Sequence, residues 1–136
     1  MSTTSGYEPS PVARPLPRFL GPGLALRLEG IAVLAGAVVL FSATDANWWL
    51  FGLLFFAPDV GLLGYLAGTR TGALTYNLTH GMLAPITLAV AGYLAGSVVL
   101  LPLALVWIAH IGFDRALGYG LKYPTEFHDT HLQRVA

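Results

Sequence analysis

Four titratable side chains lie in otherwise apolar stretches of the chain and are of types that bind metals or move protons. They are Asp59, His80, His110 and Asp114. Two imidazoles with one or two carboxylates form a ligand set that suits zinc, manganese or ferrous iron. Ionisable groups within an apolar span are costly and are usually functional or paired. We therefore take these four residues as the candidate metal ligands and catalytic residues.

Three further polar residues could assist such a site. Tyr76 and Asn77 lie within about one helical turn of His80. Glu29 lies near the start of the first apolar segment. Tyr76, Asn77 and Glu29 are the candidate cofactor-binding residues, although Glu29 could instead form an interfacial ion pair with Arg27 or Arg115.

The four candidate ligands come from three separate apolar segments, and the spacing puts them at similar depths. At a rise of about 1.5 Å per helical residue, Asp59 and His80 lie about 12 Å from the nearer ends of their segments and His110 about 10 Å. Asp114 follows His110 by four residues and shares its helix face. Pro58 directly precedes Asp59, so a kink there could direct the carboxylate inward. We expect the four side chains to converge on one polar site.

The composition indicates a membrane protein. Of 136 residues, 55% are hydrophobic and only 10% are charged, whereas a soluble domain carries about 25% charged residues. The formal net charge is zero, which gives no electrostatic reason to expect nucleic acid as a partner. The chain has no cysteine, which excludes disulfides, thiolate ligands and a thiol nucleophile.

The elements that must position the site are apolar helices. A helix needs roughly 20 apolar residues to cross a bilayer, and four segments qualify: Leu24–Thr44, Trp48–Ala67, Gly72–Ala95 and Val98–Leu117. The breaks between them are short, which makes neighbouring helices antiparallel. The predicted fold is all-α, a four-helix transmembrane bundle with up-down-up-down topology. Residues 1–23 are expected to form a disordered tail, 24–123 the transmembrane domain and 124–136 a polar tail, in which solvent exposure is the default for His128 and His131.

The basic residues predict the orientation. They occur before the first segment or at its start, between the second and third, and after the fourth; they are Arg14, Arg18, Arg27, Arg70, Arg115, Lys122 and Arg134. In an up-down-up-down bundle these positions share one face, and lysine and arginine concentrate on the cytoplasmic side. We therefore expect both termini in the cytoplasm and a multi-pass protein of the cell membrane, typically a bacterial inner membrane.

Several functions fit these residues. A divalent metal (zinc, manganese or iron) with an open coordination position would allow hydrolysis of a lipid-like substrate. His80 and His110 could instead clamp a haem, although the nearby carboxylates disfavour it. A second class is a proton or small-solute transport component, which the apolar outer halves of the segments disfavour unless a homo-oligomer completes the path. A third is a structural membrane subunit whose polar residues only join helices. The expected partners are the lipid bilayer and further copies of the chain.

Several motifs resemble an uncharacterised family of small bacterial membrane proteins. The strongest is the run from His110 to Pro124, HIGFDRALGYGLKYP, and further matches follow it at Phe127, Thr130, His131 and Leu132. Others are Leu26 to Gly30, Ala57-Pro58-Asp59, and Tyr76-Asn77 with His80. The resemblance runs from about Leu24 to Leu132 and implies a membrane location but no activity. Because it includes His131, the C-terminal tail could fold back as a cap over the site. A weaker likeness, in the Pro-Asp and intramembrane histidine residues, is to predicted membrane-bound metal-dependent hydrolases.

Overall fold

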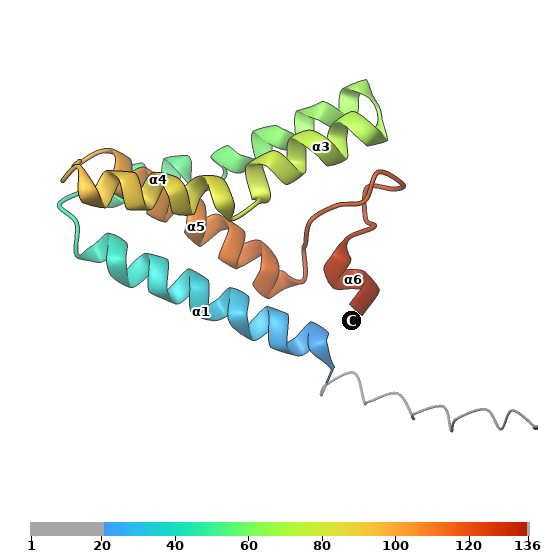
Figure 1. Ribbon diagram of the computed structural model, residues 1–136, viewed down its shortest axis with the longest axis horizontal. Coiled ribbons are helices and arrows are strands. Elements are labelled where there is room, and N and C mark those ends of the chain that lie inside the picture. Colours follow the sequence, from blue (N-terminus) through green and yellow to red (C-terminus); the bar gives the residue numbers. More distant parts are fainter. Residues whose placement is uncertain (1–20, 136) are drawn as a thin grey trace, which may run out of the picture.

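The computed structural model describes residues 21–135, and within that range the regular elements are all helices (Figure 1). They are α1 (Pro22–Ser42), α2 (Trp48–Leu54), the 3-10 helix η2 (Ala57–Ala67), α3 (Thr69–His80), α4 (Leu83–Leu94), α5 (Leu100–Leu117) and α6 (His131–Val135). Most of the disordered tail expected over 1–23 lies outside the described residues, and helix α1 already begins at Pro22.

Three helices are long and apolar enough to cross a membrane. They are Pro22–Ser42, Trp48–Ala67 (α2 and η2 taken together) and Leu100–Leu117. Large apolar side chains on their surfaces face outward: Trp49 is 86% exposed and Leu53 79%. Water would solvate so much contiguous apolar surface poorly, whereas hydrocarbon would not. The chain is therefore built as a membrane protein.

The third expected span, Gly72–Ala95, is not one continuous helix. It divides into α3 and α4, because the backbone turns to an extended conformation at Gly81 (φ −76°, ψ 136°). Pro85 has no N–H to donate to the carbonyl of Gly81, so a continuous helix would lose a hydrogen bond at this point. The structure therefore has three candidate spans where the sequence predicts four, with two shorter helices in place of the third.

A second proline marks the break in the Trp48–Ala67 segment. Helix α2 ends at Leu54, and the 3-10 helix η2, which contains Pro58, begins two residues after Phe55. Helix η2 then forms a hairpin with α3 that turns at Gly68, where φ is 109° and a residue without a side chain is favoured. The Thr75 hydroxyl donates a 2.6 Å hydrogen bond to the Gly61 carbonyl and holds the two arms together.

Helix α5 is the central element and packs against both α1 and α4. Helices α1 and α5 approach closely where two glycines meet. A Cβ atom on Gly112 would lie 2.7 Å from the backbone nitrogen of Leu34, and one on Gly30 would lie 2.6 Å from that of Ala116. Such contacts between small residues let helices pack tightly where the hydrophobic effect gives no help.

The loops sort to two ends of the molecule. The turns at 43–47 and 95–99 lie together at one end, where they line a shared cavity (Figure 1). The start of α1, the hairpin turn at Gly68 and the end of α5 lie at the other end. The basic residues of the described range belong to segments at this second end: Arg27 lies near the start of α1, Arg70 follows the hairpin turn, Arg115 lies near the end of α5, and the C-terminal segment carries Lys122 and Arg134.

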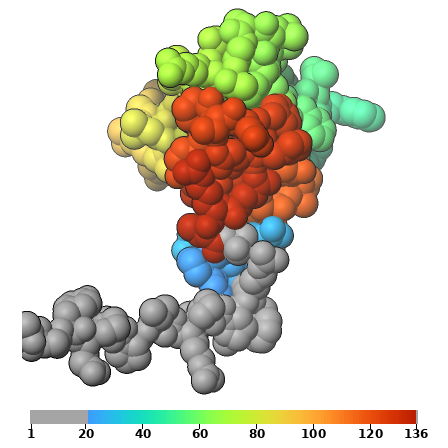
Figure 2. All heavy atoms as spheres, turned by 90° about the vertical axis from the view of Figure 1, so that its right-hand side faces the viewer, coloured from blue at the N-terminus to red at the C-terminus, as the bar shows by residue number. Residues whose placement is uncertain are grey.

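The C-terminal segment, residues 118–135, folds back onto this second end instead of leaving it (Figure 2). Lys122 forms an isolated antiparallel bridge with Thr130. The Leu121 backbone N–H donates to Nδ1 of His131 at 2.8 Å, and Leu132 is buried. The expectation that both tail histidines are exposed to solvent is therefore wrong for His131, which is half-buried and accepts a hydrogen bond from the Leu121 backbone. His128 is exposed, as expected.

Candidate metal centre

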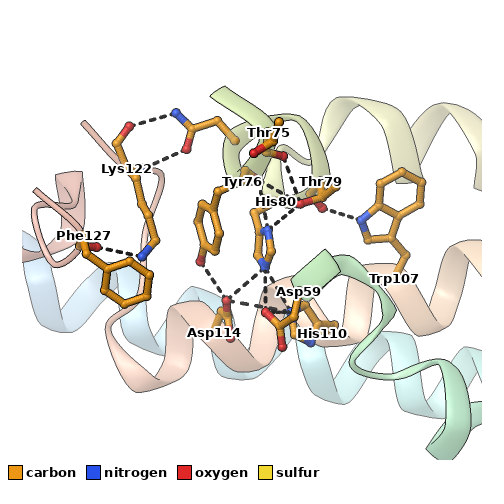
Figure 3. Close-up of polar contacts among 11 residues, drawn as sticks. Asp59, Thr75, Tyr76, Thr79, His80, Trp107, His110, Asp114, Lys122 and Phe127 are labelled. Carbon is orange, nitrogen blue, oxygen red and sulfur yellow. Dashed lines mark hydrogen bonds and ion pairs between the residues drawn. The ribbon is translucent and has the colours of Figure 1, made fainter. Parts of the chain in front are cut away.

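The four candidate ligands meet in one place, which we call the His–Asp cluster: Asp59 from η2, His80 from α3, and His110 and Asp114 from α5 (Figure 3). One nitrogen or oxygen atom from each residue lies within 4.8 Å of the corresponding atom of every other. Both proline-associated breaks contribute to this convergence. Asp59 follows Pro58 at the start of η2, and His80 is the last residue of α3.

The spacing of these atoms resembles the edges of a coordination shell. The Nε2 atom of His80 lies 3.5 Å from Oδ1 of Asp59 and 3.4 Å from Oδ2 of Asp114. The Nε2 atom of His110 lies 3.5 and 3.9 Å from the same two oxygens. Direct N–H···O hydrogen bonds are shorter, about 2.7–3.2 Å. Four ligands placed 2.0–2.1 Å from a tetrahedral zinc ion lie about 3.3 Å apart.

The His80 ring is oriented so that a lone pair faces the centre of the cluster. Its Nδ1 lies 3.0 Å from the backbone carbonyl oxygen of Tyr76 and 2.9 Å from the Thr79 hydroxyl. A carbonyl oxygen only accepts, so Nδ1 carries the proton and Nε2 of the neutral ring carries the lone pair. The ring is also stacked on that of Tyr76, with centroids 3.7 Å apart. A histidine whose outer nitrogen donates to a carbonyl is the usual arrangement of a metal ligand.

The two candidate ligands from α5 also contact neighbouring side chains. The Tyr76 hydroxyl donates a 2.9 Å hydrogen bond to Oδ2 of Asp114. The His110 ring lies edge-on to Phe55, with centroids 5.4 Å apart. Its Nδ1 is buried without a hydrogen-bond partner in residues 21–135, so Nε2, which lies 3.1 Å from Nε2 of His80, is the nitrogen turned toward the cluster.

Access to the cluster is one-sided. The side chains of His80 and His110 are 3% and 1% exposed, and that of Asp114 is 15% exposed. Asp59 differs, because 36% of its side chain is exposed. A small molecule or ion would therefore approach from the side of Asp59.

Two of the expected assisting residues lie elsewhere. Glu29 is exposed on α1 and is not part of the cluster. Asn77 is turned toward the C-terminal segment: its side-chain N–H donates to the Lys122 carbonyl at 2.9 Å, and its Oδ1 accepts from the Lys122 N–H at 2.7 Å. Of the three residues Tyr76, Asn77 and Glu29, only Tyr76 contacts the cluster.

Sequence reasoning gave no role at the site to two residues that lie near it, Trp107 and Lys122. Trp107 donates from Nε1 to the backbone carbonyl of Thr79 at 2.6 Å, which ties the end of α3 to α5. The only hint of it in the sequence was Pro85, because a helix interrupted before a proline leaves carbonyls that need donors. Lys122 is buried and its Nζ donates to the Phe127 carbonyl at 2.7 Å. Burial lowers the pKa of Lys122. A cation–π contact with the ring of Phe127, whose centroid lies 3.5 Å from Nζ, stabilises the charged form.

The geometry does not fit a haem. The two histidine rings have centroids 5.1 Å apart at an angle of 64°, and their Nε2 atoms are in hydrogen-bond contact at 3.1 Å. A haem held by both histidines would need its macrocycle between the rings. There is no room for the macrocycle. The space between these four residues suits a single ion instead.

Comparison with known proteins gives a family but no activity. No curated protein and no solved structure matches the chain. Residues 24–135 match the domain of unknown function DUF4260, a range that includes all three candidate spans except the first two residues of α1, and the whole His–Asp cluster. Because the match extends over far more than half of the sequence, the chain belongs to the DUF4260 family.

Proposed function

We propose that this membrane protein binds one divalent transition-metal ion, zinc in preference to manganese or iron, at the His–Asp cluster. The observation that carries the proposal is the arrangement of four ligand-type atoms from three helical elements within 4.8 Å of one another, with histidine–carboxylate distances of 3.4–3.9 Å. In our proposal Asp59, His80, His110 and Asp114 are the ligands.

A cation explains this arrangement better than helix-to-helix hydrogen bonding. The Nε2 lone pair of His80 faces two carboxylates that, when ionised, can only accept. The donors in contact with these acceptors are the Tyr76 hydroxyl, which bonds Asp114, and one N–H of the 3.1 Å pair of histidine Nε2 atoms. The cluster therefore holds more acceptor atoms than donors, which is costly where they are shielded from water. Either added protons or a metal ion must supply the missing positive charge. The two histidines are in hydrogen-bond contact at 3.1 Å, but the four histidine–carboxylate contacts of 3.4–3.9 Å are too long for good hydrogen bonds and suit ligands around an ion.

Zinc is the preferred ion because of the number and type of ligands. Two imidazole nitrogens and two carboxylate oxygens in a tetrahedral arrangement are ordinary zinc ligands. Manganese and magnesium favour six oxygen ligands, and ferrous iron in oxygenases is typically held by two histidines and one carboxylate with open positions. Manganese and iron are therefore the competitors to test.

The open side at Asp59 supports a hydrolytic activity on a lipid-like substrate. Zinc with an exchangeable position makes a bound water acidic enough to supply hydroxide near neutral pH. Asp59 is the most exposed ligand, and we propose that it is the one that yields its position or accepts a proton from water. In such a reaction water adds across an ester linkage, and its oxygen is transferred to the acyl or phosphoryl group while a proton goes to the leaving alcohol.

We propose that the basic end of the molecule faces the cytoplasm, so that both termini lie there and the cluster occupies the cytoplasmic half of the cell membrane. The support is the positive-inside rule together with the grouping of the described basic residues at one end. We further propose that α3 and α4 together form a fourth, broken span, which irregular backbone permits where it is covered by protein. The homo-oligomer stays a prediction.

A proton path is the main rival. It would need polar groups that continue from the cluster to the opposite end, but the chain has no Asp, Glu, His, Lys or Arg between residues 83 and 109 or between 30 and 44. The 46–58 segment is likewise free of them. A relay would therefore end in mid-membrane, which favours a binding site over a conduit.

Chelator competition with zinc on the detergent-purified full chain tests the proposal. The wild-type protein should bind one zinc per chain, and Asp59→Asn and His110→Gln should each weaken binding at least tenfold. His128→Gln is the matched control, because it removes an exposed histidine outside the cluster. Equal zinc binding by all four proteins, or none by the wild type, would contradict the metal site.

The proposed hydrolysis is tested separately. Zinc-loaded protein is incubated with phospholipid vesicles, and released fatty acid and headgroup are measured. We expect zinc-dependent release that is lost in Asp59→Asn and kept in His128→Gln. Release that persists in Asp59→Asn, or no release while zinc is bound stoichiometrically, would show that the cluster is a metal site without this activity.

A further inference from the structure

An apolar groove adjoins the His–Asp cluster. Its volume is about 470 Å³, within the range of ligand sites. It lies among α2, η2, α4, α5 and the end of α3, and its lining includes Leu54, Pro58, Thr79, Leu88, Leu103 and Trp107. Pro58 and Thr79 immediately precede Asp59 and His80 in the sequence, so the groove begins beside two of the proposed ligands.

The lining offers no free polar side-chain atom. Its only polar side chains are Thr79 and Trp107. Nε1 of Trp107 already donates to the Thr79 carbonyl, and the Thr79 hydroxyl already bonds the Tyr76 carbonyl at 3.0 Å. An occupant would gain contacts with hydrocarbon and no hydrogen bonds. The chemistry of the groove therefore selects an apolar chain.

The groove is continuous with the bilayer-facing surface. Ala57 and Val60 on its rim are exposed, and Val60 is 64% exposed. Along α5 its lining runs from Trp107 back to Leu103, a rise of about 6 Å. A chain lying in it would point from the cluster toward the opposite end of the membrane, as the tail of a lipid does in the leaflet next to the basic end.

We propose that this groove binds one hydrocarbon chain of a membrane lipid and places the polar linkage of that lipid at the His–Asp cluster. The placement of the polar linkage at the cluster rests on the proposed metal site, whereas the binding of the hydrocarbon chain does not. Each buried methylene contributes about 0.8 kcal/mol, but the same chain in the bilayer or a micelle already has most of that gain. The groove should therefore select by fit and by headgroup.

Tryptophan fluorescence gives a direct test, because Trp107 lines the groove. The protein has three tryptophans, so Trp48→Phe with Trp49→Phe leaves Trp107 as the single fluorophore. Dibromostearate is titrated into this variant in a bromine-free detergent, since bromine quenches only on contact. We expect quenching that saturates at about one fatty acid per chain, and unlabelled stearate should reverse it. Quenching that rises without saturation, or that stearate does not reverse, would overturn the proposal.

Matched variants locate the effect. Leu88→Phe with Leu103→Phe fills the groove and should abolish the saturable phase, whereas Leu66→Phe with Leu94→Phe adds the same bulk at exposed positions and should not. A single tryptophan at position 53, made by Leu53→Trp in a background with the other three changed to Phe, should show only unsaturable quenching. Equal effects of the two double variants would contradict a specific groove.

The outcomes for groove and metal are separable. Asp59→Asn leaves the groove lining intact, so saturable quenching of Trp107 should persist in it even as zinc binding falls. The groove-filling variant should keep zinc binding, because none of its changed residues is a ligand. Zinc bound without saturable quenching rejects the groove alone. Saturable quenching without zinc binding rejects the metal site and, with it, the placement of the lipid linkage at a metal.

Discussion

Replacing Asp59 with asparagine separates a metal ligand from a structural hydrogen bond. The substitution keeps the size of the side chain and its ability to hydrogen-bond, but it removes one of two negative charges in the cluster. If Asp59 only joins helices, the amide can still pair with a histidine, and hydrogen bonds of this kind in membranes contribute about 0.6 kcal/mol on average. If Asp59 is a ligand, the loss appears only when metal is present.

The magnitude follows from the structure. The carboxylate oxygens of Asp59 and Asp114 lie within 4.8 Å of each other. Two like charges at that distance repel by about 3 kcal/mol at an effective dielectric constant of about 20. Because Asp59 is 36% exposed, solvent screening reduces this figure, and the loss of attraction to any protonated histidine offsets part of it. We expect the metal-free variant to be as stable as the wild type or more stable by about 1 kcal/mol.

Thermal unfolding in detergent with and without zinc is the assay. Zinc at 100 times its dissociation constant should stabilise the wild-type protein by about 2.7 kcal/mol, or several degrees in Tm for a domain of this size. Asp59→Asn should show little or none of this rise at the same zinc concentration. A full zinc-induced rise in the variant, or a metal-free variant destabilised by about 2 kcal/mol or more, would refute the assignment of Asp59 as a ligand.

Three further predictions concern the surroundings of the cluster. Tyr76→Phe keeps the ring that stacks on the histidine but removes the hydroxyl that donates to the cluster carboxylate, so zinc affinity in chelator competition should fall about 10–100-fold; unchanged affinity would show that this hydrogen bond does not position the ligand. Asn77→Ala removes both bonds to the Lys122 backbone, so amide hydrogen exchange over residues 121–135 should accelerate about tenfold, while exchange in α5 stays the same; no acceleration would contradict the role of Asn77 as a clamp. The side-chain hydrogen bond from Arg134 lowers the pKa of Asp129 to about 2. The stabilisation from this ion pair is therefore present above the ordinary carboxyl pKa near 4 and is lost as the pH falls toward 2. Protection factors at the C-terminus, which are exchange rates corrected for the intrinsic effect of pH, should therefore fall between pH 5 and pH 2.5 in the wild type but not in Asp129→Asn.

The members of the cluster were predictable because ionisable residues are rare in apolar segments. Asp59, His80 and His110 stand out for that reason, and their distances from the ends of the segments gave the common depth. Depth does not determine which way a side chain faces. Glu29 shows the difference: it is exposed, whereas Gly30, the next residue and about 100° further around the helix, packs against α5.

The break in the third segment and the folding back of the C-terminus were less predictable. Hydropathy is continuous across Gly81, and Pro85 indicated a kink but not a complete separation of α3 from α4. The C-terminal segment is held by contacts distant in sequence, such as that between Asn77 and Lys122, which are 45 residues apart. Its polar composition resembles that of a solvated tail, so only the motif shared with the family indicated that it could be ordered.

The first coordination shell of bound zinc tests the central claim most directly. X-ray absorption at the zinc edge, on full-length protein loaded with one zinc per chain, reports the type, number and distance of the ligands. The account predicts four nitrogen or oxygen ligands at about 2.0–2.1 Å, with the outer scattering of two imidazoles. A shell of six oxygens, or one without imidazole scattering, would place the zinc outside the His–Asp cluster and contradict the account.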